Sequence, residues 1–112
     1  MIREIQTEDI TENIKEMCIE ANHQLSPDME MALNKAENEE KSGLGRQILG
    51  QLRENLQIAG DDMIPICQDT GMAVVFLEIG QDVHFTGGNL EDAVNEGVRR
   101  GYQEGFLRKS VV

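Results

Sequence analysis

Four side chains that could do chemistry stand on consecutive positions, where a thiol, an amide, a carboxyl and a hydroxyl follow one another as Cys67, Gln68, Asp69 and Thr70. Pro65 precedes them, removes one backbone donor and favours an extended conformation at Ile64. Gly71 follows them and permits backbone angles that other residues avoid. A constrained loop of this composition, directly before the most apolar run of the chain, predicts a functional site at residues 64–71.

One interpretation of this loop is an aspartic peptidase, because Asp69-Thr70-Gly71 beside an apolar run resembles the signature of that family. Two such carboxylates sharing one proton would supply an acid and a base. Those enzymes are almost entirely β, whereas helical periodicity dominates this sequence. The apolar-apolar-Gly triplet expected after the motif is not evident, since Ile48-Leu49-Gly50 lies upstream of it. This interpretation is therefore the least favoured.

Apolar residues spaced by three and four predict three helices before the loop and one near the C-terminus. Thr7 is the expected N-cap of the first helix, and His23 near its end is expected to be a C-terminal cation or a surface residue. The second helix should begin at Ser26-Pro27-Asp28, with Ser26 as its cap and Pro27 at its first helical position. Gly60 should close the third helix in a left-handed conformation. Asn89 should cap the fourth helix.

Residues 72–79 form an apolar run that predicts a strand buried on both faces. A turn at residues 80–82 should lead to a short antiparallel strand at residues 83–85. The expected fold is therefore α+β: three N-terminal helices, the cysteine loop leading into a short antiparallel β-hairpin, then a C-terminal helix. Glycines spaced by four in that helix indicate close approach by a neighbouring element, and they are Gly97, Gly101 and Gly105.

Length and charge bound the possibilities further. With 112 residues and a net charge of -11, the chain is one domain at most and has no basic face for nucleic acid or anionic membranes. It contains no transmembrane-length apolar run, and Cys18 and Cys67 do not suggest a disulfide framework. We expect a soluble, cytoplasmic protein. The absence of Trp, the 11 glycines and the apolar terminus at Val111-Val112 suggest a unit that is incomplete alone and continues in nature.

The loop from Pro65 to Gly71 resembles the cysteine loop of class I fumarate hydratases and the related L-tartrate dehydratases. Three later segments resemble the family in the same order and at similar spacing, namely Thr86-Gly87-Gly88-Asn89, Gly97-Val98 and Leu107-Arg108-Lys109-Ser110. Residues 1–112 therefore resemble the N-terminal part of the family's α domain or α subunit, truncated at its C-terminal end.

This resemblance implies a [4Fe–4S] cluster held by three cysteines, with one iron left open as a Lewis acid for the substrate. Cys67 matches one cluster ligand, whereas Cys18 matches none. Asp69 matches the residue with an acid/base role, and Gln68 and Arg108 match positions that contact the dicarboxylate. If the family resemblance is set aside, Arg108 is explained equally well as a cation near a helix C-terminus.

The implied reaction is the reversible hydration of fumarate to malate, with L(+)-tartrate dehydration as the alternative. The implied partners are a four-carbon dicarboxylate, the remainder of the α subunit, and a β subunit or C-terminal domain, assembled as an oligomer. The fragment alone should lack the cluster and be inactive. An alternative function, of a non-enzymatic class, is a non-catalytic helical module that binds a protein. It is supported by the glycine-spaced helix and the apolar terminus.

Overall fold

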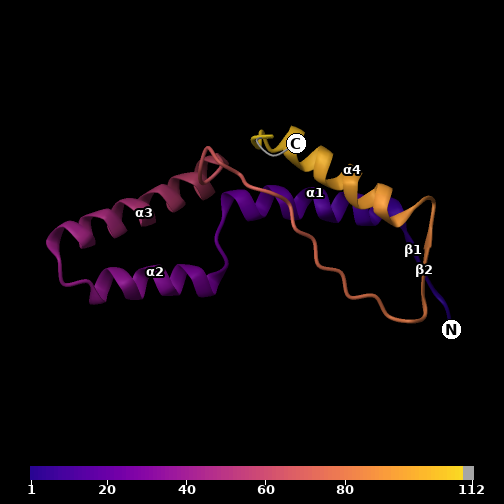
Figure 1. Ribbon diagram of the computed structural model, residues 1–112, viewed down its shortest axis with the longest axis horizontal. Coiled ribbons are helices and arrows are strands. Elements are labelled where there is room, and N and C mark those ends of the chain that lie inside the picture. The colour runs from indigo at the N-terminus through magenta and orange to yellow at the C-terminus, as the bar shows by residue number, and fades with distance from the viewer. Residues whose placement is uncertain (110–112) are drawn as a thin grey trace. The chain divides into compact units, whose positions relative to one another are not determined.

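The computed structural model describes residues 1–109 of the chain. Its elements follow the order β1, α1, α2, α3, β2, α4 (Figure 1). They divide into two compact units, one formed by Met1–Glu20 together with the chain from Asp69 onward, and the other by Ala21–Gln68. Within the described part of the chain, no helix is both long enough and apolar enough to cross a membrane.

The Ala21–Gln68 unit is a pair of helices, α2 at Pro27–Glu39 and α3 at Gly43–Asp62. Proline occupies the first turn of α2 after Ser26, as expected, although the Ser26 side chain makes no capping hydrogen bond. At the start of α3 the Ser42 hydroxyl accepts a hydrogen bond from the Gly45 amide at 3.2 Å. An ion pair of 2.8 Å between Arg53 Nε and Glu37 Oε2 links the two helices.

Two local predictions in this unit were wrong. Gly60 does not close α3, because the helix continues to Asp62 and Met63 takes the left-handed conformation with φ of 52°. The Ile64 amide then donates to the Ala59 carbonyl at 3.1 Å, which satisfies one of the last carbonyls of the helix. His23 lies in the last turn of α1, as one of its two expected roles requires, but the expectation of a surface residue was wrong because its side chain is only 1% exposed.

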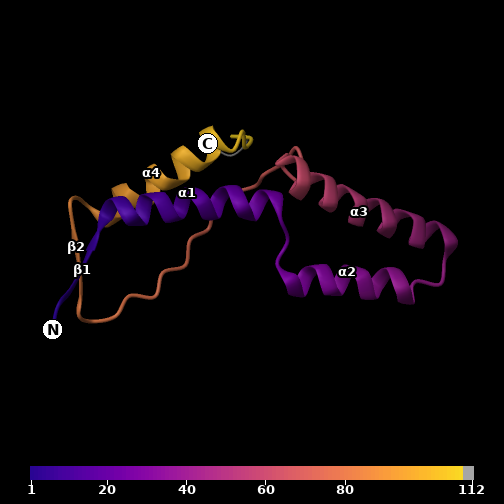
Figure 2. The same ribbon diagram turned by 180° about the vertical axis from the view of Figure 1, so that it is seen from behind.

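The other unit is built from two strands, each followed by a helix. Strand β1 (Arg3–Gln6) leads directly into α1 (Thr7–His23), and β2 (Val83–Thr86) leads through three residues into α4 (Leu90–Glu104). The strands pair in parallel, with Arg3 opposite Val83 and Gln6 opposite Thr86. Asn89 caps α4 as predicted, since its side chain accepts from the Asp92 amide at 3.3 Å. Helices α1 and α4 lie side by side in both views (Figures 1 and 2).

The glycine stripe of α4 allows this close approach, as the spacing predicted, and its partner is α1. A Cβ added at Gly97 would lie 2.6 Å from Ile14 Cβ, and one at Gly101 would lie 2.8 Å from Cys18 Cβ. A Cβ at Gly105 would lie 2.9 Å from Ile19 Cγ1. Successive glycines thus meet successive positions of α1, so the two helices run in the same direction.

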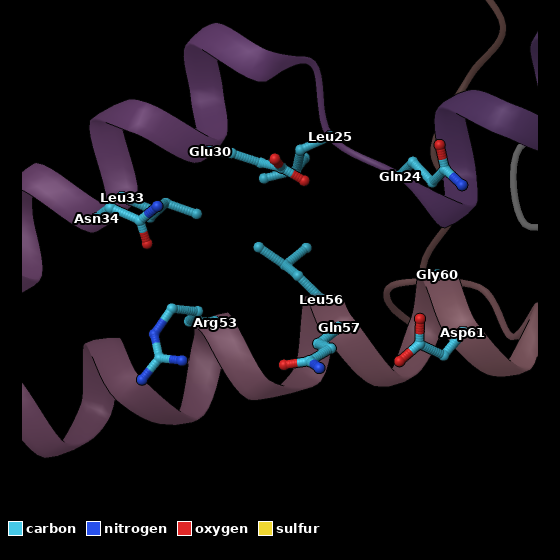
Figure 3. A pocket seen from close by; sticks show the side chains of 10 residues that line it. All are labelled: Gln24, Leu25, Glu30, Leu33, Asn34, Arg53, Leu56, Gln57, Gly60 and Asp61. Carbon is cyan, nitrogen blue, oxygen red and sulfur yellow. The ribbon is translucent and has the colours of Figure 1, made fainter.

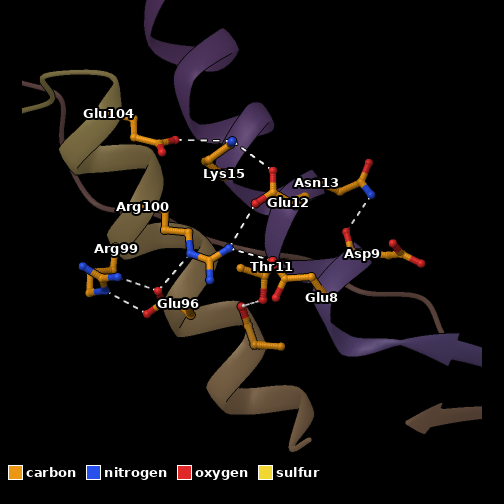
Figure 4. A network of polar contacts seen from close by, with 11 residues as sticks. Glu8, Asp9, Thr11, Glu12, Asn13, Lys15, Glu96, Arg99, Arg100 and Glu104 are labelled. Carbon is orange, nitrogen blue, oxygen red and sulfur yellow. Dashed lines mark hydrogen bonds and ion pairs between the residues drawn. The ribbon is translucent and has the colours of Figure 1, made fainter. Parts of the chain in front are cut away.

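Polar contacts join the same two helices along their length (Figure 4). The buried Thr11 hydroxyl donates to the Ala93 carbonyl at 2.9 Å. Arg100 Nη1 lies 2.8 Å from Glu8 Oε1 and 3.0 Å from Glu12 Oε1. Exposed ion pairs contribute little individually, but one guanidinium shared by two carboxylates and a buried hydroxyl bond fix the register of α4 on α1.

The predicted antiparallel hairpin does not exist, so the predicted fold arrangement was wrong. Strand β2 pairs with β1 instead, and the only sheet among residues 1–109 has these two parallel strands. Residues 72–79 form neither helix nor strand, and the expected burial fails, because Phe76 is 91% exposed and Val74 is 68% exposed. The apolar run does not pair with β2, although a turn is present at residues 81–82, within the predicted range 80–82.

Candidate active site

The boundary between the two units falls between Gln68 and Asp69, inside the cysteine motif. Cys67 and Gln68 belong to the Ala21–Gln68 unit, and both are exposed. Two hydrogen bonds hold the residue before them: the Ile66 amide donates to the Asn22 carbonyl at 2.7 Å, and Asn55 Nδ2 donates to the Ile66 carbonyl at 2.9 Å. The Cys67 thiol therefore extends from a backbone that is anchored at its preceding residue, and it is accessible to a ligand.

The other half of the motif forms a compact turn. Asp69 Oδ1 accepts a hydrogen bond from the Gly71 amide at 3.0 Å, as Asp side chains do in turns. Gly71 has φ of +66°, a conformation that residues with a Cβ rarely adopt. The carboxylate of Asp69 is exposed, so this bond orients it without removing it from solvent.

Thr70 connects this turn to the chain just after α4, at a residue that comes 38 positions later in the sequence. Its hydroxyl donates to the backbone carbonyl of Arg108 at 2.9 Å. The Tyr102 hydroxyl adds longer contacts of 3.4 Å to the carbonyls of Thr70 and Gly71. The structure thus brings the Asp69 turn and the Arg108 backbone together, two positions that lie 39 residues apart in the sequence and that the family resemblance had both selected.

The end of α4 fixes the backbone that carries Arg108. Phe106 takes the left-handed conformation with φ of 56°, and the Leu107 amide donates back to the Tyr102 carbonyl at 2.9 Å. This pattern is the Schellman motif of helix C-termini. Leu107 is then buried in the core of its unit, with 5% of its surface exposed. An anchored residue on its N-terminal side therefore sets the position of the exposed Arg108.

A groove of about 610 Å³ lies between the segment after the turn and α4. Its apolar wall includes Val94, Val98 and Tyr102, which are spaced by four on one face of α4. Arg108 and Lys109 also line it, and the structure shows no ion pair for either within residues 1–109. Arg99 lines the groove too but pairs with Glu96, so Arg108 and Lys109 are the two cations that, within residues 1–109, remain for a small molecule that carries carboxylates.

A second pocket, of about 400 Å³, lies within the Ala21–Gln68 unit between α2 and α3 (Figure 3). Leu25, Leu33 and Leu56 project into it, and charged residues including Glu30 and Arg53 stand at its sides. None of the candidate site residues lines this pocket, so we assign it no part in the chemistry.

The sequence predicted neither the contribution of Tyr102 nor the long-range hydrogen bond of Thr70. Tyr102 is the single tyrosine of the chain and shares a helical face with Val94 and Val98, which was the available signal. The long-range bond of Thr70 had no comparable signal, because nothing in the sequence pairs position 70 with position 108.

The side chains of this chain can supply a metal cluster with one accessible thiolate. Cys67 is exposed, whereas Cys18 lies half-buried where α1 meets Gly101 of α4. Burial raises the pKa of the Cys18 thiol, which opposes the thiolate that metals bind. Across residues 1–109, no group of three His, Cys, Asp or Glu side chains could hold a metal ion. These residues therefore do not fit a complete three-cysteine site, although Cys67 fits one ligand of such a site.

Comparison with known proteins is consistent with the cysteine-loop resemblance. A family model described as fumarate hydratase (Fumerase) matches residues 11–112. A protein of Methanocaldococcus jannaschii named "Putative L(+)-tartrate dehydratase subunit alpha" is 34% identical over 104 residues, which are 92% of this chain and 36% of the relative. The "Fumarate hydratase class I, anaerobic" of Escherichia coli is 42% identical over 60 residues, 54% of this chain and 11% of the relative.

A protein of Geobacillus stearothermophilus named "Putative fumarate hydratase class I" is 24% identical over 106 residues, 94% of this chain and 20% of that relative. The chain thus spans about a third or less of these relatives. Because the family model covers residues 11–112, nearly the whole chain, the chain belongs to the fumarate hydratase (Fumerase) family.

Proposed function

We propose that residues 1–112 are the N-terminal part of an iron–sulfur hydro-lyase that reversibly hydrates fumarate to malate, and that this part is inactive alone. The observation that carries the proposal is the 2.9 Å bond from Thr70 to the Arg108 carbonyl. In a chain of this family, it brings a carboxylate-bearing turn to the base of an arginine beside a groove. An acid/base group and a carboxylate-binding group are what hydration of an unsaturated dicarboxylate needs.

In this proposal Asp69 transfers the proton, while Arg108 and Gln68 bind the substrate carboxylates. Hydration forms a C–O bond at one alkene carbon and a C–H bond at the other, so one group must give or take a proton. The exposed carboxylate of Asp69 is held by the Gly71 amide at 3.0 Å and is available for this exchange. The Arg108 guanidinium can bind a carboxylate through two parallel hydrogen bonds.

Cys67 is proposed as one thiolate ligand of a [4Fe–4S] cluster, with the remaining ligands supplied from elsewhere in the enzyme. Such a cluster would supply Lewis-acid chemistry at the substrate oxygens. The support on this chain is the exposure of Cys67 and the anchored backbone before it. Cys18 is not included, because α4 packs against it.

The partners in the proposal are the rest of an α subunit and a β subunit or C-terminal domain, in an oligomeric, cytoplasmic enzyme. The apolar run at residues 72–79 supports this, since Phe76, Val74 and Met72 are exposed by 91%, 68% and 69%. Exposed apolar residues in one continuous segment mark a surface that another part of an assembly covers. The glycine face of α4 offers no support for a separate binding module, because Gly97 and Gly101 are buried against α1.

A second candidate is the α subunit of an L(+)-tartrate dehydratase, which would remove water from tartrate to give oxaloacetate. It is favoured by the 34% identity with the archaeal relative of that name, which covers 92% of this chain. The two substrates share the four-carbon dicarboxylate skeleton, so the same Arg108 and Asp69 roles apply to both.

The test is the Asp69→Asn variant of the complete enzyme, with all the chains that purify together, prepared without oxygen. We expect its iron content and visible absorption to match wild type and its turnover to fall about 100-fold or more, as for loss of a general acid or base. Asp82→Asn is the matched control, since Asp82 is an exposed carboxylate of the same unit outside the site. Unchanged turnover in Asp69→Asn would remove Asp69 from the mechanism. Assaying fumarate and L(+)-tartrate in parallel decides between the two candidates.

A further inference from the structure

We propose that Thr70 is a positioning residue, whose hydroxyl sets the Asp69 turn against the Arg108 backbone so that acid/base group and carboxylate clamp act on one substrate. The inference rests on the proposed function and adds a residue to it. Thr70 touches neither substrate nor cofactor in this account. It acts through the two residues that do.

Thr70 is half-buried, and its hydroxyl lies 2.9 Å from the Arg108 carbonyl oxygen, which is within the usual range for an O–H donor and a carbonyl acceptor. The residue is held on its other side as well, where the Tyr102 hydroxyl lies 3.4 Å from the Thr70 carbonyl. A loop residue is thus held at both its side chain and its backbone by the end of α4.

The acceptor of this hydrogen bond lies on an anchored backbone. Leu107 is 5% exposed and its amide donates to the Tyr102 carbonyl at 2.9 Å, so burial and this hydrogen bond hold the backbone that leads into Arg108. The hydrogen bond from Thr70 to Arg108 therefore holds the turn against an anchored part of the backbone after α4, and does not join two mobile segments.

The turn passes this constraint on to the Asp69 carboxylate. Asp69 precedes Thr70 directly, and its Oδ1 accepts from the Gly71 amide at 3.0 Å. The carboxylate, the hydroxyl and the glycine amide thus move as one turn. Removing the hydroxyl would leave only the longer Tyr102 contacts of 3.4 Å to hold the turn, and misplacing a catalytic group by about 1 Å can cost about 100-fold in rate.

The chain offers a matched control in the same unit. Thr11 is 3% exposed, and its hydroxyl donates to the Ala93 carbonyl at 2.9 Å. Thr11→Val therefore removes a threonine-to-carbonyl bond of the same length between α1 and α4, at a place that has no role in the proposed site. Thr70→Ser keeps the hydroxyl of Thr70, and Thr70→Val replaces it with a methyl group of similar shape.

The experiment compares these three variants in the complete enzyme by kcat, KM, iron content and amide hydrogen exchange at Gly71. In Thr70→Val we expect kcat/KM to fall about 10- to 100-fold with iron content unchanged. KM should rise because Arg108 is displaced from the substrate carboxylate, and kcat should fall because Asp69 is displaced from the position for proton transfer. Exchange at Gly71 should be several-fold faster. Thr70→Ser should stay within a few-fold of wild type, and Thr11→Val should lower Tm without changing kcat or KM.

Wild-type kinetics in Thr70→Val would overturn the inference, and so would a Thr70→Ser variant no better than Thr70→Val. An equal kinetic loss in Thr11→Val would do the same, because it would mark a general effect on the fold. The exchange measurement separates the two proposals. If the enzyme hydrates neither fumarate nor tartrate but exchange at Gly71 is faster in Thr70→Val, the proposed function is wrong and the role of the Thr70 hydrogen bond stands. If exchange at Gly71 is unchanged in Thr70→Val, the proposed role of that hydrogen bond is wrong.

Discussion

Gly97 is the position where the packing of α4 on α1 leaves least room for a side chain. A Cβ there would lie 2.6 Å from Ile14 Cβ and 2.7 Å from the Thr11 carbonyl oxygen. Ordinary carbon contacts are about 3.5–4.0 Å, so the helices would have to separate by about 1 Å. Neither neighbouring atom is the end of a flexible side chain, and neither can turn away.

The Gly97→Ala substitution sets two opposing effects against each other. Alanine favours the helix by about 1 kcal/mol over glycine. Overpacking a tight interface costs about 1–3 kcal/mol, and the contacts at Gly97 put this case at the upper end. We therefore expect a net loss of about 1–2 kcal/mol in the free energy of unfolding. For a domain of this size, each kcal/mol lowers Tm by about 4–8 °C.

The assay is thermal and urea unfolding followed by circular dichroism, with Gly43→Ala as the control. Gly43 opens α3 and has no atom within 4 Å of its would-be Cβ. Its substitution should change the free energy of unfolding by less than about 0.5 kcal/mol. If Gly97→Ala raised Tm or left it unchanged, α4 would not pack on α1 as described.

Two further predictions concern α4. Hydrogen bonds from Arg99 and then Arg100 lower the pKa of Glu96 from 4.5 to about 2, so the stability that Glu96 contributes is present above about pH 4.5 and is lost as pH falls towards 2. Glu96→Gln should therefore flatten the fall of Tm across that window relative to wild type, and an unaltered slope would contradict the ion-pair geometry. Phe106 is 88% exposed with φ of 56°, so Phe106→Gly should raise the free energy of unfolding by about 0.5–1 kcal/mol in urea titrations through relief of left-handed strain. A loss of stability would refute that reasoning.

Features fixed by local chemistry were predictable from the sequence. Proline in the first turn of α2 and the Asn89 cap of α4 depend on residues within one turn of each other. The glycines at positions 97 and 101 predicted a close neighbour because little else justifies glycine in a helix interior. Their partner could not be named, since it lies about 80 residues earlier in α1.

Features that depend on distant partners were not predictable. Strand β1 has no alternating apolar pattern, because Ile5 is its one apolar residue and is only half-buried. Its partner β2 begins 80 residues later in the sequence. The apolar run at 72–79 was more strand-like than β1, yet it has no strand partner within the described chain. Periodicity reports what a segment could bury and says nothing about which surface will cover it.

The candidate site divides in the same way. Cys67, Gln68 and Asp69 are adjacent in sequence and carry recognisable chemistry, so the motif itself was predictable. Arg108 was selected through a family resemblance, and its contact with Thr70 emerges only from the fold. The backbone that positions Arg108 depends on the left-handed Phe106, and no turn residue such as glycine or asparagine announces that conformation.

The central claim is that this chain contributes a cluster ligand to an iron–sulfur hydro-lyase. The direct measurement is the visible absorption, iron content and fumarate hydration of the complete enzyme, purified without oxygen, as wild type and as Cys67→Ser. Cys18→Ser is the matched control, because Cys18 lies at the α1–α4 contact. We predict a brown, active wild type and Cys18→Ser variant, with colour and turnover both lost in Cys67→Ser. A wild-type enzyme that stays colourless, free of iron and inactive with fumarate and tartrate after anaerobic reconstitution would contradict the account.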